Sequence, residues 1–501
     1  MTFEIYPSYS EFSRLAKQAT VIPVWGALLA DLDTPVSAFL KLDDGKSSFL
    51  LESVEGEEKL ARFSFLGSRP RLVVIGQQGR LVLRPGPEHD GISRRLPTSG
   101  DPLTQIEELM HGFRAAPMPG LPRFTGGLVG YVGYNTVRSI ERIPPFARDP
   151  LQVPDLALML TESMIIFDHA QHKMLVVVNA FLDGTSPRRA YQQAVTQVQA
   201  LARQVSIRTP RAALRPLPRR TEAAIRSNLS RAQFADMVGR AKRYIRDGEI
   251  IQTVLSQRFE RRCRASPLDV YRALRSLNPS PYMYLLRFGS LSLVGSSPEM
   301  LVRCEEGRIQ TRPIAGTRPR GATEQQEARL IHQLIRSPKE RAEHLMLVDL
   351  GRNDLGRVAQ IGSVATPELM VIEKYSHVMH LVSGVHARLR PGRNAFDVLR
   401  ATFPAGTVTG APKVRAMEII AELERDDRGP YAGAVGYFSF SGNLDTCITI
   451  RTIVLQGQRA SVQAGAGIVA DSNAAREYQE TVNKAKGCLQ AIALAEAGLA
   501  Q

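Results

Sequence analysis

The sequence lacks the long apolar runs of a membrane-spanning chain. No run among its 501 residues approaches the roughly 20 consecutive apolar residues that cross a bilayer as a helix. The first residues, MTFEIYPSYSEF, also lack the basic and apolar regions of a secretory signal peptide. We therefore expect a cytoplasmic protein that makes no contact with a membrane.

Cysteine is scarce as well. The chain has four cysteines, Cys263, Cys304, Cys447 and Cys488. They lie far apart and form no C-x-x-C pair or cluster with histidine, which argues against a disulfide framework and against a zinc site. We expect all four to be small buried residues, because a chain of this length with 44% hydrophobic residues can bury its core without a disulfide or a metal.

Positive charge is in excess, with a formal net charge of +15. The densest basic stretch, residues 208–226, contains Pro210, Pro216 and Pro218, lacks interleaved aromatic residues and has no helical periodicity. These features favour a solvated linker over a nucleic-acid surface. We expect no nucleic-acid partner, since the charge also suits an anionic small substrate. Salt-sensitive retention on DNA without enzymatic turnover would support the opposite interpretation.

The linker, residues 206–227, divides the chain into two portions. Before it, residues 1–205 contain short apolar runs at 49–54, 72–75, 156–167 and 174–181, separated by turn residues, which is typical of sheet. After it, residues 228–495 begin with a capping box of Ser230 and Gln233, which predicts a helix that Gly248 ends. A strand is expected at residues 250–259. Without regular strand–helix alternation, we predict an α+β layered sandwich of mostly antiparallel sheets flanked by helices.

Two further helices are expected to carry carboxylates. A capping box of Ser337 and Glu340 predicts a helix to about residue 351, on which Glu343 lies beside apolar neighbours. Carboxylates contributed by two separate helices offer the hard oxygen ligands that Mg²⁺ prefers. An exposed position for Glu343 is the simpler interpretation if this helix is taken alone.

The second of these helices is expected at about residues 473–492, where Glu477, Glu480 and Lys484 share one face. Residues 463–468 precede it, and their small side chains allow backbone N–H groups to approach a ligand near a helix N-terminus. An ordinary surface pair between Glu480 and Lys484, four positions apart, is the alternative.

Arg451 lies in an expected strand at residues 447–455, where its near neighbours are apolar or threonine. A guanidinium group in such a setting needs a carboxylate or phosphate partner. A substrate carboxylate and a cross-strand ion pair would satisfy it equally well, and the sequence leaves both open.

Four long motifs, in this order, resemble those of chorismate-utilising enzymes. They are PIAGTRPRG (313–321), EHLMLVDLGRND (343–354), FPAGTVTGAPK (403–413) and the segment 465–484. The match is strong over residues 228–490, and the N-terminal half resembles the regulatory portion of anthranilate synthase component I. The resemblance implies the layered fold of that family and a Mg²⁺-dependent lyase that converts chorismate and ammonia to anthranilate and pyruvate in tryptophan biosynthesis.

The resemblance also implies the site residues. Glu343 and Glu480, supported by Glu477, would hold Mg²⁺ against the ring carboxylate of chorismate. The implied substrate contacts are Gly316, Thr317, Thr407, Tyr431, Arg451, Gly465, Ala466, Gly467 and Lys484. Glu299 would be the general acid that protonates the leaving ring hydroxyl, and His380 matches a histidine linked to pyruvate elimination.

Two positions separate this chain from sibling activities. Gln252 stands where isochorismate and salicylate synthases carry a lysine that activates water, so ammonia is favoured as the nucleophile. Ala315 stands where aminodeoxychorismate synthases commonly carry lysine, which removes an amine able to act as a covalent nucleophile. Aminodeoxychorismate synthase component I is the nearest alternative. A catalytically silent tryptophan sensor is disfavoured by the intact acidic residues.

Control and partners are implied by the same resemblance. Glu52 and Ser53, with Pro281, Tyr282 and Met283, match a tryptophan-binding element, so they would line an inhibitor pocket distinct from the active site. None of the cysteines lies in a nucleophile-elbow setting. Ammonia is therefore expected from a separate glutamine amidotransferase subunit, in a heterotetramer of two large and two small subunits.

Overall fold

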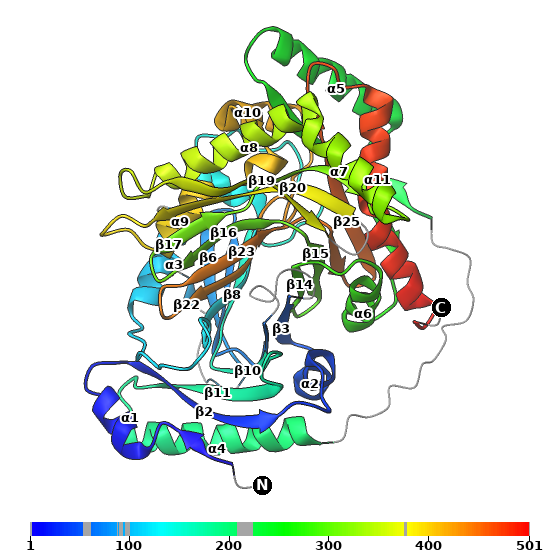
Figure 1. Ribbon diagram of the computed structural model, residues 1–501. Helices are drawn as coiled ribbons and strands as arrows, with labels where there is room; N and C mark the ends of the chain where they lie inside the picture. The colour runs from blue at the N-terminus through cyan, green and yellow to red at the C-terminus, as the bar shows by residue number, and fades with distance from the viewer. Residues whose placement is uncertain are drawn as a thin grey trace.

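The computed structural model describes residues 3–53, 62–87, 89, 94–95, 101–207, 224–374 and 378–499. Most of the linker expected at 206–227 lies outside these residues. Two large sheets face each other, and helices cover their outer surfaces (Figure 1). The predicted α+β sandwich of antiparallel sheets is confirmed. Within the described residues, no helix is both long and apolar enough to span a membrane.

The first sheet contains 13 strands of the described chain. In spatial order they are β1 (Ile5–Tyr6), β2 (Val21–Leu29), β11 (Lys173–Phe181), β10 (Ser163–Asp168), β4 (Phe63–Ser68), β3 (Ser47–Glu52), β14 (Tyr282–Phe288), β15 (Leu291–Ser297), β24 (Thr452–Gln456), β25 (Arg459–Ile468), β13 (Gln252–Arg262) and β12 (Arg226–Ser227), with β21 (Gly410–Ala411) also paired to β13.

The second sheet contains 12 strands of the described chain. In spatial order they are β18 (Ile314–Pro319), β20 (Val378–Arg388), β17 (Arg308–Thr311), β16 (Met300–Glu305), β23 (Leu444–Ile448), β22 (Ala434–Ser439), β8 (Gly127–Val132), β9 (Leu156–Leu160), β5 (Leu72–Gln77), β6 (Arg80–Pro85) and β7 (Arg94–Arg95), with β19 (Ala365–Lys374) also paired to β20.

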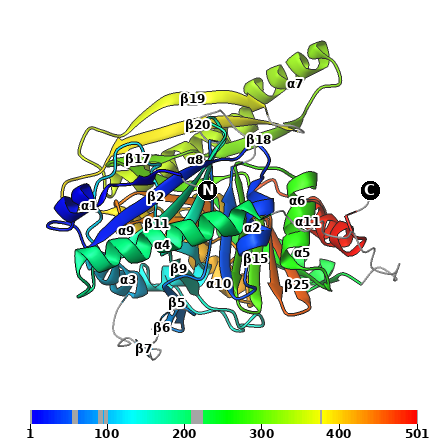
Figure 2. The same ribbon diagram turned by 90° about the horizontal axis from the view of Figure 1, so that it is seen from below.

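The helices pack on the outer faces of the sheets. They are α1 (Tyr9–Leu15), α2 (Pro35–Leu42), α3 (Pro102–His111), α4 (Pro187–Ser206), α5 (Arg231–Arg246), α6 (Pro267–Leu277), α7 (Glu324–Arg336), α8 (Pro338–Gly356), α9 (Ala395–Thr402), α10 (Lys413–Glu424) and α11 (Ala474–Glu496), with short 3₁₀ turns η1 (Tyr134–Ser139) and η2 (Gly406–Val408). Helix α4 lies across β2 and β11, as the view from below shows (Figure 2). Helices α6 and α11 pack together against the other end of the same sheet.

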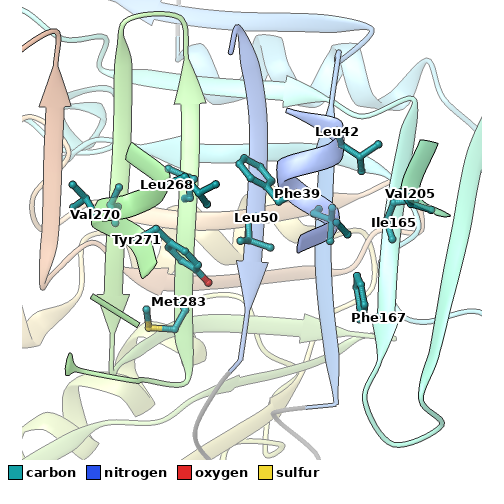
Figure 3. Packing of buried hydrophobic residues seen from close by; sticks show 14 of the residues in the cluster. Phe39, Leu42, Leu50, Ile165, Phe167, Val205, Leu268, Val270, Tyr271 and Met283 are labelled. Carbon is teal, nitrogen blue, oxygen red and sulfur yellow. The ribbon is translucent and has the colours of Figure 1, made fainter. Parts of the chain in front are cut away.

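The core has apolar layers on both sides of the first sheet. In the outer layer, Phe39 of α2 and Tyr271 of α6 pack over strands that carry Leu50 and Met283 (Figure 3). Between the two sheets, a second layer includes the fully buried Tyr131. The four cysteines are buried and free, as predicted.

Both portions of the chain contribute strands to each sheet. β3 from the first portion pairs with β14 from the second, and β8 pairs with β22 in the other sheet. The division at residues 206–227 stays a prediction about chain organisation, but hydrogen bonding in each sheet continues across it. A ligand that moves one portion therefore acts on strands of the other.

Two apolar runs that the sequence presents as single strands are each divided between the sheets. Residues 156–167 form β9 in the second sheet and β10 in the first. Residues 447–455, expected as one strand around Arg451, separate into β23 and β24 in the same way. The prediction of one strand at 447–455 was wrong because an apolar run shows burial but not which sheet buries it.

The three predicted helices are present, and two of them, α8 and α11, run four to five residues further than expected. Of the second predicted capping box only one half forms, because Ser337 accepts from the Glu340 amide while the Glu340 carboxylate pairs with Arg318. The Ser230 and Gln233 capping box is present, with bonds of 3.2 and 2.8 Å. Helix α8 ends at Gly356 instead of about residue 351. Gly351 lies inside the helix, where a Cβ atom would be 3.1 Å from Thr311 Cγ2, so this glycine allows close packing against the sheet.

Candidate active site

Residues 463–468 belong to strand β25, and the expectation that they introduce a helix N-terminus was wrong. Gly465 pairs with Ser256 of β13, and Gly467 pairs with Val254. The neighbouring strand β24 is paired only as far as Val462, so beyond it one edge of β25 has no strand partner in the described chain. Helix α11 begins at Ala474, six residues after the end of β25.

This open edge of β25 presents backbone groups toward α11. Lys484 Nζ donates a hydrogen bond of 3.0 Å to the Gly465 carbonyl, which fixes the direction of that residue. The N–H and C=O of one strand residue point to the same edge, so the Gly465 and Gly467 amides face this side too. A Cβ atom on Gly465 would lie 2.5 Å from the Tyr431 hydroxyl. Ala466, between the two glycines, is fully buried.

Arg451 lies where the chain passes from β23 to β24. Its backbone has a φ of 51°, a conformation that residues other than glycine rarely adopt. One guanidinium nitrogen donates to the Lys484 carbonyl at 2.7 Å. Within the described residues no carboxylate lies within 4 Å of it, so the cross-strand ion pair left open by the sequence is not formed. Burial lowers its pKa, which leaves a guanidinium that an anionic ligand would stabilise.

Glu299 lies between β15 and β16, next to the same site. The residue as a whole is partly buried, and protein surrounds its carboxyl group. Burial raises the pKa of Glu299 to about 7, although the Thr407 hydroxyl and the Lys484 ammonium act to lower it. A carboxyl group that is half protonated near neutral pH suits general acid catalysis.

Three carboxylates on α8 and α11 share one electrostatic environment. Burial raises the pKa values of Glu343 and Glu477, and the negative charge of Glu480 raises both further. Glu480 also pairs with Lys484 at 2.7 Å, so the surface pair considered from the sequence is present. In the described part of the chain, no three acidic, histidine or cysteine side chains converge to hold a metal by themselves.

The donor set nevertheless fits Mg²⁺. This ion usually takes only one or two protein carboxylates and keeps water or substrate oxygens in its other positions. Glu343 and Glu480 come from separate helices, and like-charge repulsion from Glu480 adds to burial in raising the pKa of Glu343. A bound divalent cation would relieve that repulsion.

His380 lies on β20, opposite Thr317 of β18. Its Nδ1 lies 3.1 Å from the Thr317 hydroxyl and 3.2 Å from the Gly316 carbonyl. Burial lowers the pKa of His380, and the positive charge of Arg451 contributes in the same direction. Gly316 has a φ of 61°, and a Cβ atom there would lie 2.7 Å from Leu334 Cδ1.

Gln252 begins β13 and is buried beside Gly467. A Cβ atom on Gly467 would lie 2.8 Å from Gln252 Nε2, so the amide group faces the glycine strand. Its Oε1 atom is buried and has no hydrogen-bond partner among the described residues. The position therefore offers a neutral acceptor next to the β25 edge.

His344 is a site neighbour that sequence reasoning missed. It follows Glu343 on α8, is fully buried, and its Nε2 lies 2.6 Å from Ser383 Oγ. Burial lowers its pKa to about 4, so the ring stays neutral and anchors α8 to β20. A histidine on the apolar face of the predicted helix was the available signal.

The five residues predicted for an inhibitor pocket line one narrow cavity between the sheets. We call it the inhibitor cavity; its further lining is Leu51, Phe63, Phe65, Arg123, Tyr284, Arg303, Val435, Gly436, Tyr437, Asp445 and Cys447. Asp445 accepts hydrogen bonds from the Tyr282 hydroxyl at 3.0 Å and from Arg303 Nε at 2.9 Å. Arg123 adds a third at 3.1 Å.

Glu52 forms the other charged wall of the inhibitor cavity. It accepts a hydrogen bond from the Tyr271 hydroxyl and lies 3.3 Å from Arg275 Nε. Burial raises the pKa of Glu52 despite these two partners. Each charged side chain in this cavity is therefore paired with an oppositely charged side chain of the protein, whereas Arg451 bonds only a backbone carbonyl.

Comparison with known proteins assigns the family. The family model described as chorismate binding enzyme matches residues 47–490. The chain belongs to this family. It is 48% identical over 491 residues to anthranilate synthase component 1 from Acetivibrio thermocellus, covering 97% of this chain and 98% of the relative. It is also 48% identical over 496 residues to the protein of that name from Pseudomonas putida, with the same coverage.

A solved structure agrees with these relatives. The crystal structure of anthranilate synthase component I from Streptococcus pneumoniae TIGR4 has a TM-score of 0.76 and 38% sequence identity to this chain. The match covers 92% of this chain and 99% of that one.

Proposed function

We propose that this chain is the chorismate-converting subunit of an anthranilate synthase. Arg451 carries the proposal: it is half-buried, has no carboxylate partner among the described residues, and donates to the backbone carbonyl of Lys484, whose ammonium in turn bonds the Gly465 carbonyl at the β25 edge. Chorismate is a dianion, so one carboxylate can pair with Arg451 while the other faces the acidic helices. The names of the relatives support the choice of chorismate and of anthranilate as product.

Each carboxylate of chorismate has a proposed partner. Arg451 and the Gly465 and Gly467 amides would take the enolpyruvyl carboxylate, with charge-assisted bonds that fix its orientation. Glu343 and Glu480, with Glu477 in support, would hold Mg²⁺ against the ring carboxylate. The ion, when bound, neutralises that carboxylate and the protein carboxylates facing it.

The proton transfers fall to Glu299 and His380. As ammonia forms a bond to the ring, the ring hydroxyl leaves as water with a proton from Glu299. The neutral His380 would then accept a proton from the ring carbon that carries it while the ring C–O bond to the enolpyruvyl group breaks, so that the ring becomes aromatic. The released enolpyruvate takes up a proton to become pyruvate. Thr317 and the Gly316 carbonyl orient this imidazole through its Nδ1 atom.

We also propose feedback control and an ammonia-supplying partner. Tryptophan would occupy the inhibitor cavity, where the aromatic walls suit an indole ring. Ammonia would come from a separate glutamine amidotransferase subunit, in a heterotetramer of two large and two small subunits. Free ammonium should replace that subunit in a test of the isolated chain.

One assay tests the proposal. Purified protein is mixed with chorismate, ammonium and Mg²⁺ at mildly alkaline pH, and anthranilate is followed by its fluorescence. Production of anthranilate with release of pyruvate, reduced by tryptophan, is the expected result. A product that retains the enolpyruvyl group by mass spectrometry would instead identify an aminodeoxychorismate synthase, and no turnover would contradict the enzymatic proposal.

A further inference from the structure

The end of β15 lies between the inhibitor cavity and the candidate active site. Strands β14 and β15 pair so that Tyr282 is opposite Ser297 and Met283 is opposite Ser296. Tyr282 and Met283 line the inhibitor cavity. Both serines are fully buried. A change in the position of the cavity wall therefore acts directly on the last two residues of β15.

On its other side, Ser297 is bonded to the backbone around Glu299. The Ser297 hydroxyl donates to the Ile448 carbonyl at 2.7 Å and accepts a long contact of 3.4 Å from the Glu299 amide. The Ile448 amide donates to the Glu299 carbonyl at 3.0 Å. Together these bonds form a closed loop in which one buried hydroxyl joins the strand end that precedes Glu299 to the strand end that precedes Arg451.

Ser296 fixes the backbone of Arg451 from the same strand end. Its amide donates to the Arg451 carbonyl at 3.1 Å. Its hydroxyl lies 2.8 Å from Ser280 Oγ, in the segment that leads into the inhibitor cavity. Glu299 and Arg451, which the proposed reaction needs in fixed relation, are thus both attached to Ser296 and Ser297.

The Ser297 contact to Glu299 is sensitive to small movements. A hydrogen bond of 3.4 Å is at the limit of useful geometry, so a shift of a few tenths of an ångström breaks it. Removing the hydroxyl would also leave the buried Ile448 carbonyl without this donor. No charge is involved, so the effect of the hydroxyl must be one of position.

We propose that Ser297 is a positioning residue, whose hydroxyl fixes Glu299 relative to Arg451 and transmits occupancy of the inhibitor cavity, through Tyr282, to the active site. The inference rests on the proposed function, because it gives Glu299 its role as the acid. It adds a residue and a route of coupling to that function.

The test compares Ser297→Ala with Ser292→Ala in the full chain. Ser292 is a matched control, since it is buried on the same strand and its partner on β14 is Arg287, which does not line the inhibitor cavity. We expect Ser297→Ala to lower kcat by about tenfold to a hundredfold, with a change of less than about threefold in the KM for chorismate. The control should match the unsubstituted protein.

A pH profile separates positioning from a general loss of structure. Glu299 must be protonated to act, so turnover falls as pH rises through its pKa of about 7. In Ser297→Ala the Glu299 carboxyl group is held less tightly and is more exposed to water, so its pKa moves down toward the ordinary value. The alkaline limb should therefore move to lower pH in Ser297→Ala alone. An unchanged kcat and an unchanged limb would overturn the positioning role.

The coupling is tested with tryptophan. Ser297→Ala should need at least about fivefold more tryptophan for half inhibition than Ser292→Ala, and in the unsubstituted protein tryptophan should change amide hydrogen exchange in a peptide spanning residues 295–300. Unaltered inhibition, or unaltered exchange, would overturn the coupling. If the unsubstituted protein makes no anthranilate, it is the proposed function that fails. If it does and the two variants agree, only the role of Ser297 fails.

Discussion

The candidate active site and the inhibitor cavity differ in how their charges are balanced. In the active site, Arg451 has no carboxylate partner in the described chain, and burial, with the negative charge of Glu480, raises the pKa values of Glu343 and Glu477. In the inhibitor cavity, Asp445 is bonded to Arg303 and Arg123, Arg123 also lies 3.5 Å from Glu305, and Glu52 is paired with Arg275, so three carboxylates face three guanidinium groups. The first region needs ions from outside to be neutral, whereas the second is neutral before a ligand arrives.

This difference indicates distinct binding energetics. A ligand of the active site gains charge-assisted hydrogen bonds and relieves repulsion, so binding there should respond strongly to charge and to metal. A ligand of the inhibitor cavity would mainly contact aromatic side chains such as Phe65 and Tyr437, whose ring centroids lie 6.0 Å apart. Its binding should respond to shape.

The largest expected effect is at Glu299. Glu299→Gln keeps the shape of the side chain and removes the transferable proton, so turnover should fall by about 10²- to 10⁴-fold. In the unsubstituted protein the protonated form is lost as pH rises through about 7, and this decline should be absent from the variant at a fixed concentration of free ammonia. A variant with full turnover and the same pH profile would show that another group donates the proton.

Removing Asp445 should break the internal neutrality of the inhibitor cavity. Arg303 is buried and would be left without its carboxylate, a loss of about 3 to 5 kcal/mol for an uncompensated buried charge. Thermal unfolding of Asp445→Ala should therefore begin at a clearly lower temperature. Removing the exposed Asp349, which pairs with Arg352 at the surface, is the control and should change stability by less than about 1 kcal/mol.

Arg451→Ala tests the other side of the comparison. The variant lacks the guanidinium that would pair with a substrate carboxylate. Its kcat/KM for chorismate should therefore fall by an amount equivalent to about 2 to 5 kcal/mol of transition-state binding. Because Arg451 has no internal carboxylate partner, its removal should leave stability less affected than Asp445→Ala does. If Arg451→Ala unfolds more readily than Asp445→Ala, the guanidinium is a structural group.

The smallest expected change in turnover is at Ser53. Ser53→Arg inserts a long charged side chain into a cavity that is already neutral, so tryptophan inhibition should weaken by at least about tenfold. Turnover without tryptophan should change far less. Titration of tryptophan against anthranilate production measures both, and unchanged inhibition would remove Ser53 from the pocket.

Local signals in the sequence were enough for much of the fold. Helix α5 has its capping box, and α11 begins directly after its N-cap residue Asn473, as expected. The division of residues 447–455 between two sheets was not visible, because a positive φ at an arginine has no sequence signature. Pairing with β13 likewise placed the glycines at 465 and 467 in a strand instead of a helix entry.

For the two sites, motif resemblance supplied candidate residues but not how those residues are arranged in space. The five predicted inhibitor residues meet around one cavity, yet Arg123, Arg303 and Asp445 were missed. They come from segments far apart in sequence that only sheet pairing brings together. The link through Ser297 was hidden for the same reason, since Ile448 lies 151 positions away along the chain.

Calorimetry of chorismate binding in ammonium-free buffer, with and without Mg²⁺, tests most directly whether the active site clamps a dianion between a cation and Arg451. Mg²⁺ should tighten binding at least about tenfold in the unsubstituted protein and in Arg451→Ala, although the latter binds more weakly throughout. In a Glu343→Gln, Glu480→Gln double variant this dependence on Mg²⁺ should disappear. Binding that is equally tight without Mg²⁺, or that keeps its full Mg²⁺ dependence in the double variant, would contradict the account.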